Sequence, residues 1–339
     1  MKKIPIFFTF DNNYVEPAAV AFYSLLNKAK SGVLYEMYVL HSDITEEKQK
    51  LLIDIVNKKG NAKLTFINTK GFLSEFWENG SFNFSSSNST FTVDTVLRCF
   101  GAKFFPQYDK IIYSDVDIVV VDDISEIYDV DLTSKYVAGV KNPFSHWSKD
   151  ELSHLKPEHY EMLHDKYIAG GIWVMNLKKI REDNLEQRMV DIIKDETIIK
   201  RWNDQDIINI ACEGKVGFLP INYISYPYMI DLLTHPDFKS DYTREELFDS
   251  IINPKIIHFA ADKPWNSNPK YSNLWWTFFH YLNLEKTKIF KDPEPPVNPL
   301  QSDLDKQLKK VKKYKKLFKC LLFLVVLLLV TIVIMAFSK

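Results

Sequence analysis

Two aspartates, Asp115 and Asp117, interrupt a stretch that otherwise has the composition of a buried strand. The apolar runs 111–113 and 118–121 on either side are rich in β-branched residues, which suit a strand covered on both faces of a sheet. On a continuous strand both carboxylates would point to the same face and be buried without partners, which is strongly unfavourable. The pattern therefore requires a cation or a bend. Carboxylates at a strand end suit Mg²⁺ or Mn²⁺, and a polar strand end with an acidic turn is the simpler alternative.

The composition is that of a globular protein with one large or two ordinary domains. Of its 339 residues, 46% are hydrophobic and 26% are charged. The formal net charge of −1 gives no general attraction to nucleic acid, so no nucleic-acid partner is expected. Three widely separated cysteines, Cys99, Cys212 and Cys320, show neither metal-ligand spacing nor a disulfide framework, which favours a reducing compartment.

The C-terminal segment has a different character. Residues 320–337 carry no charge and would form a helix of about 27 Å, close to the thickness of a bilayer's hydrocarbon core. A lysine-rich segment, 306–319, precedes it, after a proline-rich linker at 286–305. The pattern predicts a transmembrane helix that anchors the protein in the cell membrane, with the lysines against anionic headgroups and the folded part in the cytoplasm. The apolar run 4–10 is too short for a signal peptide.

Strands and helices alternate along the first half of the chain, which predicts an α/β fold with a mostly parallel, Rossmann-like sheet and flanking helices. One of these helices is expected over residues 94–105, before Pro106. The glycines form neither a G-x-G-x-x-G nor a G-x-x-x-x-G-K-[ST] motif, which disfavours a dehydrogenase and a P-loop NTPase. Phosphates would have to be neutralised by a metal ion, lysine or arginine.

Five short blocks occur in one order along residues 1–285. They are Phe8-Thr-Phe-Asp-Asn-Asn-Tyr14, Arg98 ahead of Tyr113-Ser-Asp-Val-Asp117, Ala169-Gly-Gly-Ile-Trp-Val-Met-Asn176, Asn203-Asp-Gln-Asp206 and His258-Phe-Ala-Ala-Asp-Lys-Pro-Trp265. The ordered set resembles glycosyltransferase family 8, retaining, metal-dependent enzymes of the GT-A fold that include lipopolysaccharide galactosyl- and glucosyltransferases. The resemblance implies that residues 1–130 bind the nucleotide-sugar and the metal, and that residues 131–285 bind the acceptor and close the active site.

The resemblance also implies a role for each matching residue on the donor side. Four residues would hold the uridine of a UDP-sugar: Thr9 through its backbone, Asp11, Asn13 and Tyr14. Arg98 would reach the nucleotide or the diphosphate. Without the other blocks, residues 11–13 would be interpreted as a strand-ending turn, and Arg98 as a surface cation.

Asp115, Asp117 and His258 would be the metal ligands, and an imidazole beside two carboxylates favours Mn²⁺ over Mg²⁺. Asp115 would also take part in donor binding. Lys263 would neutralise the β-phosphate as UDP leaves. Outside this block, a lone histidine is usually structural and a lone lysine usually solvated.

Asp204 and Gln205 would lie under the sugar and act in catalysis. Retention by two inversions requires a carboxylate nucleophile, which Asp204 could supply. We favour same-face attack by the acceptor with a phosphate oxygen as base, in which Asp204 and Gln205 position the sugar and the Gln205 carbonyl stabilises positive charge. The histidines at 154, 159 and 164 are spaced by five, so we interpret them as surface or satisfied residues rather than ligands.

Two departures from the family pattern bear on this hypothesis. Ala169 occupies a position where the family usually has asparagine, so a hydrogen bond to the donor sugar is missing or supplied elsewhere. The segment 258–263 is one residue shorter than usual and has Ala261 near the place of a glycine, which affects contact with the phosphates.

The sequence as a whole predicts a retaining hexosyltransferase that moves glucose or galactose from a UDP-sugar to a glycan or lipid-linked acceptor at the cytoplasmic membrane face. The alternative is a catalytically weak UDP-sugar-binding membrane protein that assists an active transferase. A nucleotidyltransferase or nucleotide-sugar phosphatase would be expected to carry a glycine-rich phosphate loop or further clustered carboxylates, and neither is evident.

Overall fold

The computed structural model describes residues 1–72, 93–144, 152–198, 201–235, 238–287 and 289–290. All of them fall within one compact unit, Met1–Lys291. The proline-rich linker beyond residue 291, the lysine-rich segment 306–319 and the apolar segment 320–337 lie outside the described residues.

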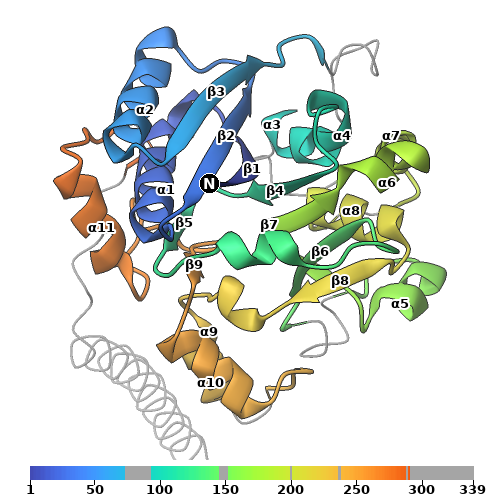
Figure 1. The fold of residues 1–339 in the computed structure, drawn as a ribbon. Coiled ribbons are helices and arrows are strands. Elements are labelled where there is room, and N and C mark those ends of the chain that lie inside the picture. Colours follow the sequence, from blue (N-terminus) through green and yellow to red (C-terminus); the bar gives the residue numbers. More distant parts are fainter. Residues whose placement is uncertain (73–92, 145–151, 199–200, 236–237, 288, 291–339) are drawn as a thin grey trace, which may run out of the picture. The chain divides into compact units, whose positions relative to one another are not determined.

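A seven-stranded sheet forms the centre of this unit (Figure 1). Its strands, in spatial order, are β3 (Ala62–Asn68), β2 (Val33–His41), β1 (Lys2–Thr9), β4 (Lys110–Ser114), β7 (Ile168–Asn176), β6 (Val137–Lys141) and β8 (Val216–Leu219). Strand β7 runs antiparallel to both of its neighbours, and every other pair in the sheet is parallel. The predicted mostly parallel α/β sheet is therefore confirmed.

Both faces of the sheet are covered, as the apolar strands predict. Ile6 and Phe8 of β1 pack into the core that includes α1 (Val15–Lys28) and α2 (Glu46–Lys59). Phe7, between them, points into the opposite core. Helix α2 ends at Gly60, whose φ of 73° allows the left-handed turn that terminates the helix.

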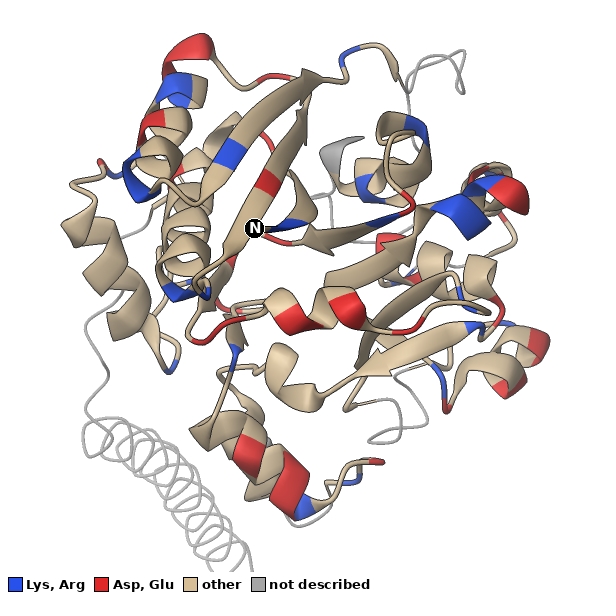
Figure 2. Ribbon diagram, in the orientation of Figure 1, with Lys and Arg blue, Asp and Glu red and all other residues tan. Residues whose placement is uncertain are grey.

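The second core is covered by short helices. They are α3 (Val93–Leu97), α4 (Gly101–Phe104), α5 (Pro157–Leu163), α6 (Leu177–Glu182), α7 (Leu185–Lys194) and α8 (Asp204–Cys212). The remaining helices of the described part are α9 (Met229–Leu233), α10 (Arg244–Ile252) and α11 (Ser272–Tyr281), with 3₁₀ turns η1 (Asn12–Tyr14), η3 (Arg98–Phe100), η4 (Ser125–Asp129) and η5 (Ile221–Tyr223). In Figure 2 the charged residues lie mainly on helices and loops, and β7 and β8 carry none.

The single helix predicted over residues 94–105 is wrong. The segment is α3, the turn η3 and the one-turn helix α4, with Phe100 at φ −107° and ψ 30° between the last two. A Cβ atom on Gly101 would lie 3.4 Å from the side chains of Phe7 and Leu177. The break lets the backbone approach the sheet closely at this glycine, which helical periodicity does not reveal.

The chain bends at Asp115 and Asp117, and a bend was one of the two solutions, with a bound cation, that the sequence pattern requires. Strand β4 ends at Ser114, and β5 (Ile118–Val120) pairs antiparallel with β9 (Ile256–His258) in a separate two-stranded sheet. Ile118 is paired with His258. Asp115 and Asp117 therefore lie where the chain passes from one sheet to the other, beside the end of β9.

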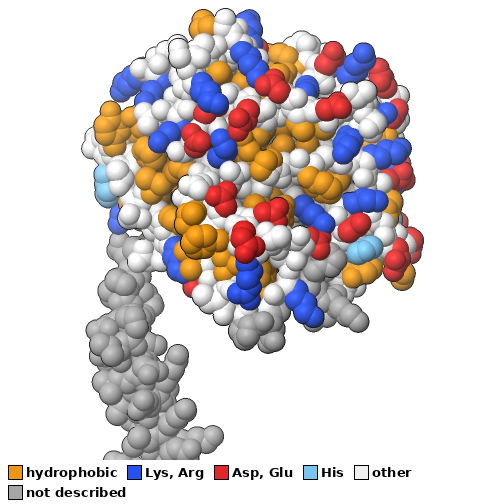
Figure 3. Space-filling model, turned by 60° about the horizontal axis from the view of Figure 1, so that its bottom comes forward, with side chains coloured by type: hydrophobic (Ala, Val, Ile, Leu, Met, Phe, Trp, Pro, Cys, Tyr) orange, Lys and Arg blue, Asp and Glu red, His pale blue; other side chains and the backbone are white. Residues whose placement is uncertain are grey.

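The predicted location in the cell membrane is wrong on the described residues. In the described part of the chain, no helix is long and apolar enough to cross a bilayer. The longest helices there, α1 and α2, have 14 residues each, about 21 Å against the roughly 30 Å of hydrocarbon. On the face seen in Figure 3, acidic and basic side chains are interspersed with small apolar groups. We therefore withdraw the prediction of a single-pass anchor and the cytoplasmic location that followed from it.

Candidate metal and donor site

The three predicted metal ligands meet at one point. Asp115 and Asp117 come from the bend between β4 and β5, and His258 is the last residue of β9. One ligand atom from each residue lies within 4.8 Å of the others. His258 Nε2 is 3.2 Å from Asp117 Oδ1 and 3.5 Å from Asp115 Oδ2. Two carboxylates and one imidazole form a donor set that fits Mn²⁺ or Mg²⁺.

Basic groups compensate the charge of the two carboxylates. Arg98 Nη1 lies 2.9 Å from Asp115 Oδ1, and the Lys263 ammonium is bonded to Asp117. Burial alone would raise the pKa of both carboxyls, but Arg98 beside Asp115, Lys263 beside Asp117, and His258 beside both hold them below their ordinary values. Burial alone would lower the pKa of His258, and the charges and hydrogen bonds of the two aspartates raise it to about 9. The cluster therefore keeps its carboxylates ionised.

Lys263 is held by the short loop that begins at His258. Its ammonium donates to the carbonyls of Phe259 (2.6 Å) and Ala260 (2.9 Å) as well as to Asp117. Backbone carbonyls of the loop therefore hold its own lysine beside Asp117.

Gly171 leaves room for the His258 ring directly against β7. Its backbone is in the left-handed region, with φ 104°, and a Cβ atom there would lie 2.6 Å from His258 Cε1 and Nδ1. The Asp115 N–H donates to the Gly171 carbonyl (2.8 Å). Gly171 thus contacts two of the three candidate ligands, a role that sequence reasoning missed. The only signal was the glycine pair 170–171 in the third block.

Arg98 links the candidate metal ligands to the predicted catalytic residues. The same Nη1 atom that contacts Asp115 lies 3.1 Å from Asp204 Oδ2. The guanidinium packs 4.9 Å from the centre of the Tyr113 ring, and the Tyr113 hydroxyl donates to Asp115. Burial raises the pKa of Asp204 to about 6, with Arg98 opposing the shift and Asp115 adding to it. Tyr113 is a second contact residue that sequence reasoning did not single out.

Asp204 and Gln205 open α8, immediately after Asn203, whose φ of 51° is unusual for a residue other than glycine. Gln205 Oε1 accepts a hydrogen bond of 2.5 Å from the backbone N–H of Gly170. The third and fourth sequence blocks are therefore in direct contact.

The predicted uridine residues lie at the carboxyl end of β1. Asp11 accepts hydrogen bonds from the backbone N–H of Asn13 (2.9 Å) and from its side-chain amide (3.0 Å), so it caps η1. Tyr14 meets Trp265 edge-on, with the ring centres 5.8 Å apart, which joins the first block to the last. The hydroxyl oxygen of Thr9 is buried and has no hydrogen-bond partner among the described residues. Asp11 and Asn13 thus form the strand-ending turn that residues 11–13 suggest when they are taken alone. This turn lies at the carboxyl end of a strand, where a ligand is expected in such a sheet.

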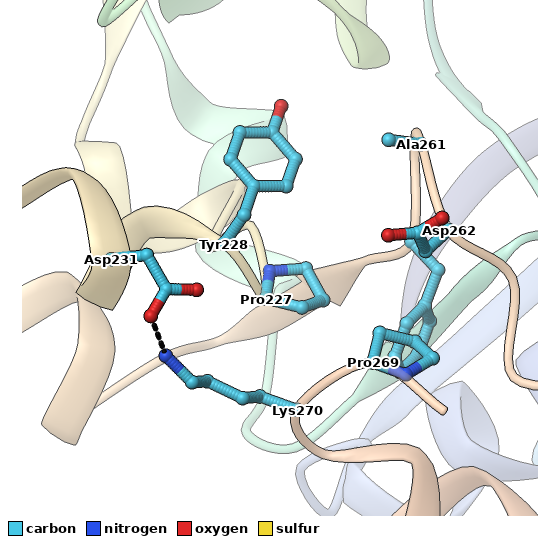
Figure 4. Close-up of a pocket in the computed structure, with 8 residues that line it drawn as sticks. Pro227, Tyr228, Asp231, Ala261, Asp262, Pro269 and Lys270 are labelled. Carbon is cyan, nitrogen blue, oxygen red and sulfur yellow. Dashed lines mark hydrogen bonds and ion pairs between the residues drawn. The ribbon is translucent and has the colours of Figure 1, made fainter. Parts of the chain in front are cut away.

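A pocket with about 350 Å³ of empty space adjoins the loop that carries Lys263 (Figure 4). Its lining residues come from the start of α9 and from the segment after β9: Pro227, Tyr228, Asp231, Phe259, Ala261, Asp262, Pro269 and Lys270. Asp231 and Lys270 form an ion pair of 2.5 Å at one end, and Asp262 lies across from them. The pocket offers charged and aromatic groups to a polar ligand.

The sheet and the bend with its ligand cluster define the GT-A architecture. The sequence model of glycosyl transferase family 8 matches residues 5–269, so the chain belongs to this family and is a glycosyltransferase.

The sequence identity to individual relatives is low. A putative glycosyltransferase of Haemophilus influenzae is 25% identical over 229 residues, 67% of this chain and 65% of that protein. A lipopolysaccharide 1,2-glucosyltransferase of Escherichia coli K12 is 28% identical over 55% of this chain and 52% of that protein. The chain thus spans less than two thirds of either relative. The structure of the galactosyltransferase LgtC, solved with donor and acceptor sugar analogues, matches with a TM-score of 0.66 at 19% identity, over 84% of this chain and 98% of that one.

Proposed function

We propose that the chain is a metal-dependent, retaining hexosyltransferase that moves glucose or galactose from a UDP-sugar to a glycan or lipid-linked acceptor. The observation that carries the proposal is the cluster of Asp115, Asp117 and His258, with Arg98 joining it to Asp204. Family membership supports the reaction class, and the names of the E. coli relative and of LgtC motivate the choice of sugars.

The donor would be held by the chain's own groups around this cluster. Asp115, Asp117 and His258 would hold Mn²⁺ or Mg²⁺, which supplies positive charge to the diphosphate when bound. Lys263 lies beside Asp117 and would bind the β-phosphate where negative charge grows as UDP leaves. The end of β1, with Thr9 and Tyr14, would hold the uridine.

Sugar transfer would occur beside the start of α8. The bond between the anomeric carbon and the UDP oxygen breaks, and the acceptor oxygen forms its bond on the same face. The acceptor's proton passes to an oxygen of the departing diphosphate. Asp204 and Gln205 would orient the sugar, and the Gln205 carbonyl oxygen would stabilise the positive charge that develops on the ring.

The acceptor would enter through the pocket of Figure 4. Its lining residue Ala261 belongs to the same loop as Lys263, and the whole lining lies within residues 131–285. Carboxylates, an ammonium group and a tyrosine suit the hydroxyl groups of a sugar.

The test is a thermal-shift panel on the full chain with UDP-glucose and UDP-galactose, each with Mn²⁺, Mg²⁺ or a chelator, followed by UDP release over time. We expect metal-dependent stabilisation by one donor, slow donor hydrolysis, and faster UDP release when a glycan acceptor is added. Stabilisation without any UDP release would instead favour the UDP-sugar-binding partner protein. No stabilisation by any UDP-sugar would contradict both.

A further inference from the structure

Asn12 ties the turn at the end of β1 to a neighbouring loop. The bonds from Asn13 to Asp11 are local, so they shape the turn without holding it against the rest of the molecule. Asn12 makes the longer contacts. Its N–H donates to Asp43 Oδ1 (2.9 Å), and its side-chain oxygen accepts from the N–H of Thr45 (3.2 Å). The turn is therefore fixed to the loop between β2 and α2.

A third contact to Asn12 comes from the first turn of α2. The Lys48 ammonium donates to the backbone carbonyl of Asn12 (3.0 Å) and lies 3.0 Å from Glu16 Oε1, in the first turn of α1. The side chains of Lys48 and Glu16 are only 23% and 7% exposed, so the carboxylate is compensated by the ammonium more than by water. One ammonium thus joins the turn to the starts of two helices.

The loop that receives the turn is itself held in place. The Ile44 N–H donates to Nδ1 of the buried His41 (3.1 Å). The Gln49 side-chain amide donates to the Ile44 carbonyl (2.9 Å), and its backbone N–H donates to the Thr45 carbonyl (2.9 Å). His41 is the last residue of β2, which pairs with β1. The loop is therefore fixed beside the strand that carries the turn, and can support it.

We propose that Asn12 and Lys48 are positioning residues that hold the turn at residues 11–14 in the orientation that binds the nucleoside part of the donor. Neither residue has to touch the donor. A turn that is held before binding costs less free energy to order when the ligand arrives. Loss of Lys48 should therefore weaken nucleotide binding and leave the chemistry at the metal cluster unchanged. The inference rests on the proposed function, because it presumes that the uridine lies at this turn.

The test compares Lys48→Met with Lys59→Met in the full chain. Lys59 is a matched control, because it lies at the other end of α2 and its ammonium donates to Asn27 Oδ1, near the end of α1 (2.7 Å). Figure 1 shows these two helices side by side. The measurements are calorimetric titrations of UDP with Mn²⁺ present and of Mn²⁺ alone, and kcat for UDP release at saturating donor.

We expect the Kd for UDP to rise about tenfold in Lys48→Met, with the Kd for Mn²⁺ alone and kcat unchanged within about twofold. Lys59→Met should match the wild type in all three quantities. A weaker nucleotide affinity beside an intact metal affinity and kcat is a result that a general loss of structure would not produce.

A second variant separates positioning from stability. Lys48→Met leaves the Glu16 carboxylate buried without its cation, so it should also lower the thermal stability. Adding Glu16→Gln removes that charge and should recover much of the lost stability. The double variant should still bind UDP as weakly as Lys48→Met, because the Asn12 carbonyl still lacks its ammonium donor. Wild-type UDP affinity in the double variant would overturn the proposal.

Two further results would overturn it. One is wild-type UDP affinity in Lys48→Met, and the other is an equal loss of UDP affinity in Lys59→Met or of Mn²⁺ affinity in Lys48→Met. A wild-type chain that binds no UDP with Mn²⁺ would overturn the proposed function and this inference with it. A wild type that binds UDP beside an unaffected Lys48→Met overturns this inference alone.

Discussion

Two aspartate pairs at the candidate site, each with one residue between its members, lie in opposite settings. Asp115 and Asp117 lie at the bend between two sheets and face Arg98, Lys263 and His258. The pair at 204 and 206 opens a helix, where one carboxylate shares Arg98 and the other is held by Tyr167, the Trp202 N–H and His154. The same sequence spacing thus produces two different electrostatic environments.

The difference follows from what surrounds each carboxylate. Basic groups hold the pKa of Asp115 and of Asp117 below the ordinary value, which keeps the pair charged and suited to a cation. Asp204 shares the single Nη1 atom of Arg98 with Asp115, so burial is incompletely offset and its pKa rises to about 6. We therefore propose the metal site at the first pair, where a basic group lies beside each carboxylate. For the second pair we propose a role in positioning the sugar.

The largest effect is expected from breaking the first pair. Asp117→Asn removes one charged ligand and leaves Lys263 without its carboxylate, so UDP release should fall by about a thousandfold. The measurement is UDP release with Mn²⁺. Asp109→Asn is the control, because Asp109 is 80% exposed and its contact with Arg181 is 3.6 Å long. Equal losses in the two variants would contradict the assignment.

Arg98 joins the two pairs, and its replacement should affect both. Arg98→Gln leaves the buried Asp204 and the partly buried Asp115 without their shared cation, so the free energy of unfolding should fall by about 3 kcal/mol and kcat by about a hundredfold. Urea unfolding and UDP release measure the two effects. A variant with wild-type kcat would show that the two pairs work independently.

Gly171→Ala tests the geometry of the first pair without removing a charge. The new Cβ would lie 2.6 Å from the His258 ring on a backbone with φ 104°, so we expect a loss of about 2–3 kcal/mol in stability and about tenfold weaker Mn²⁺ binding. Gly60→Ala is the control, because its φ is 73° and nothing lies within 4 Å of the added atom. It should lose about 1 kcal/mol and bind Mn²⁺ normally. Equal Mn²⁺ affinities in both variants would contradict a role for Gly171.

The smallest effect concerns pH and the second pair. Burial raises the pKa of Asp204 from 3.8 to about 6 in the folded protein, so the folded state holds a proton that the unfolded state has already released. This contribution to stability is complete below about pH 4 and is lost as pH rises through 6. Urea unfolding between pH 4 and 7 should therefore show a steeper decline in stability for the wild type than for Asp204→Asn. Parallel curves would contradict the shift.

Much of the fold could be predicted from the sequence, because its signals are local. Alternating strands and helices predict the parallel sheet, and the interrupted strand at residues 111–121 predicts either a bound cation or a bend, of which the structure shows the bend. The ordered blocks name the residues that the structure brings together around Asp115. Their individual roles stay predictions.

What the sequence could not provide are contacts between distant segments. The close approach of Gly101 to Phe7 breaks an expected helix, and the contact of Gly171 with His258 joins β7 to β9. The bond from Tyr167 to Asp206 crosses 39 positions, with no periodicity to reveal it. The membrane location was inferred from composition alone, and the described residues do not support it.

The central claim is that Asp115, Asp117 and His258 bind the cation through which the protein recognises a UDP-sugar. Calorimetric titration of UDP-glucose and UDP-galactose into the full chain tests it most directly, with Mn²⁺ or with a chelator, for the wild type and for Asp117→Asn. We predict that one donor binds tightly only with Mn²⁺, and that Asp117→Asn binds it equally weakly in both conditions. Donor affinity that is the same with Mn²⁺ and with the chelator in the wild type would contradict the claim.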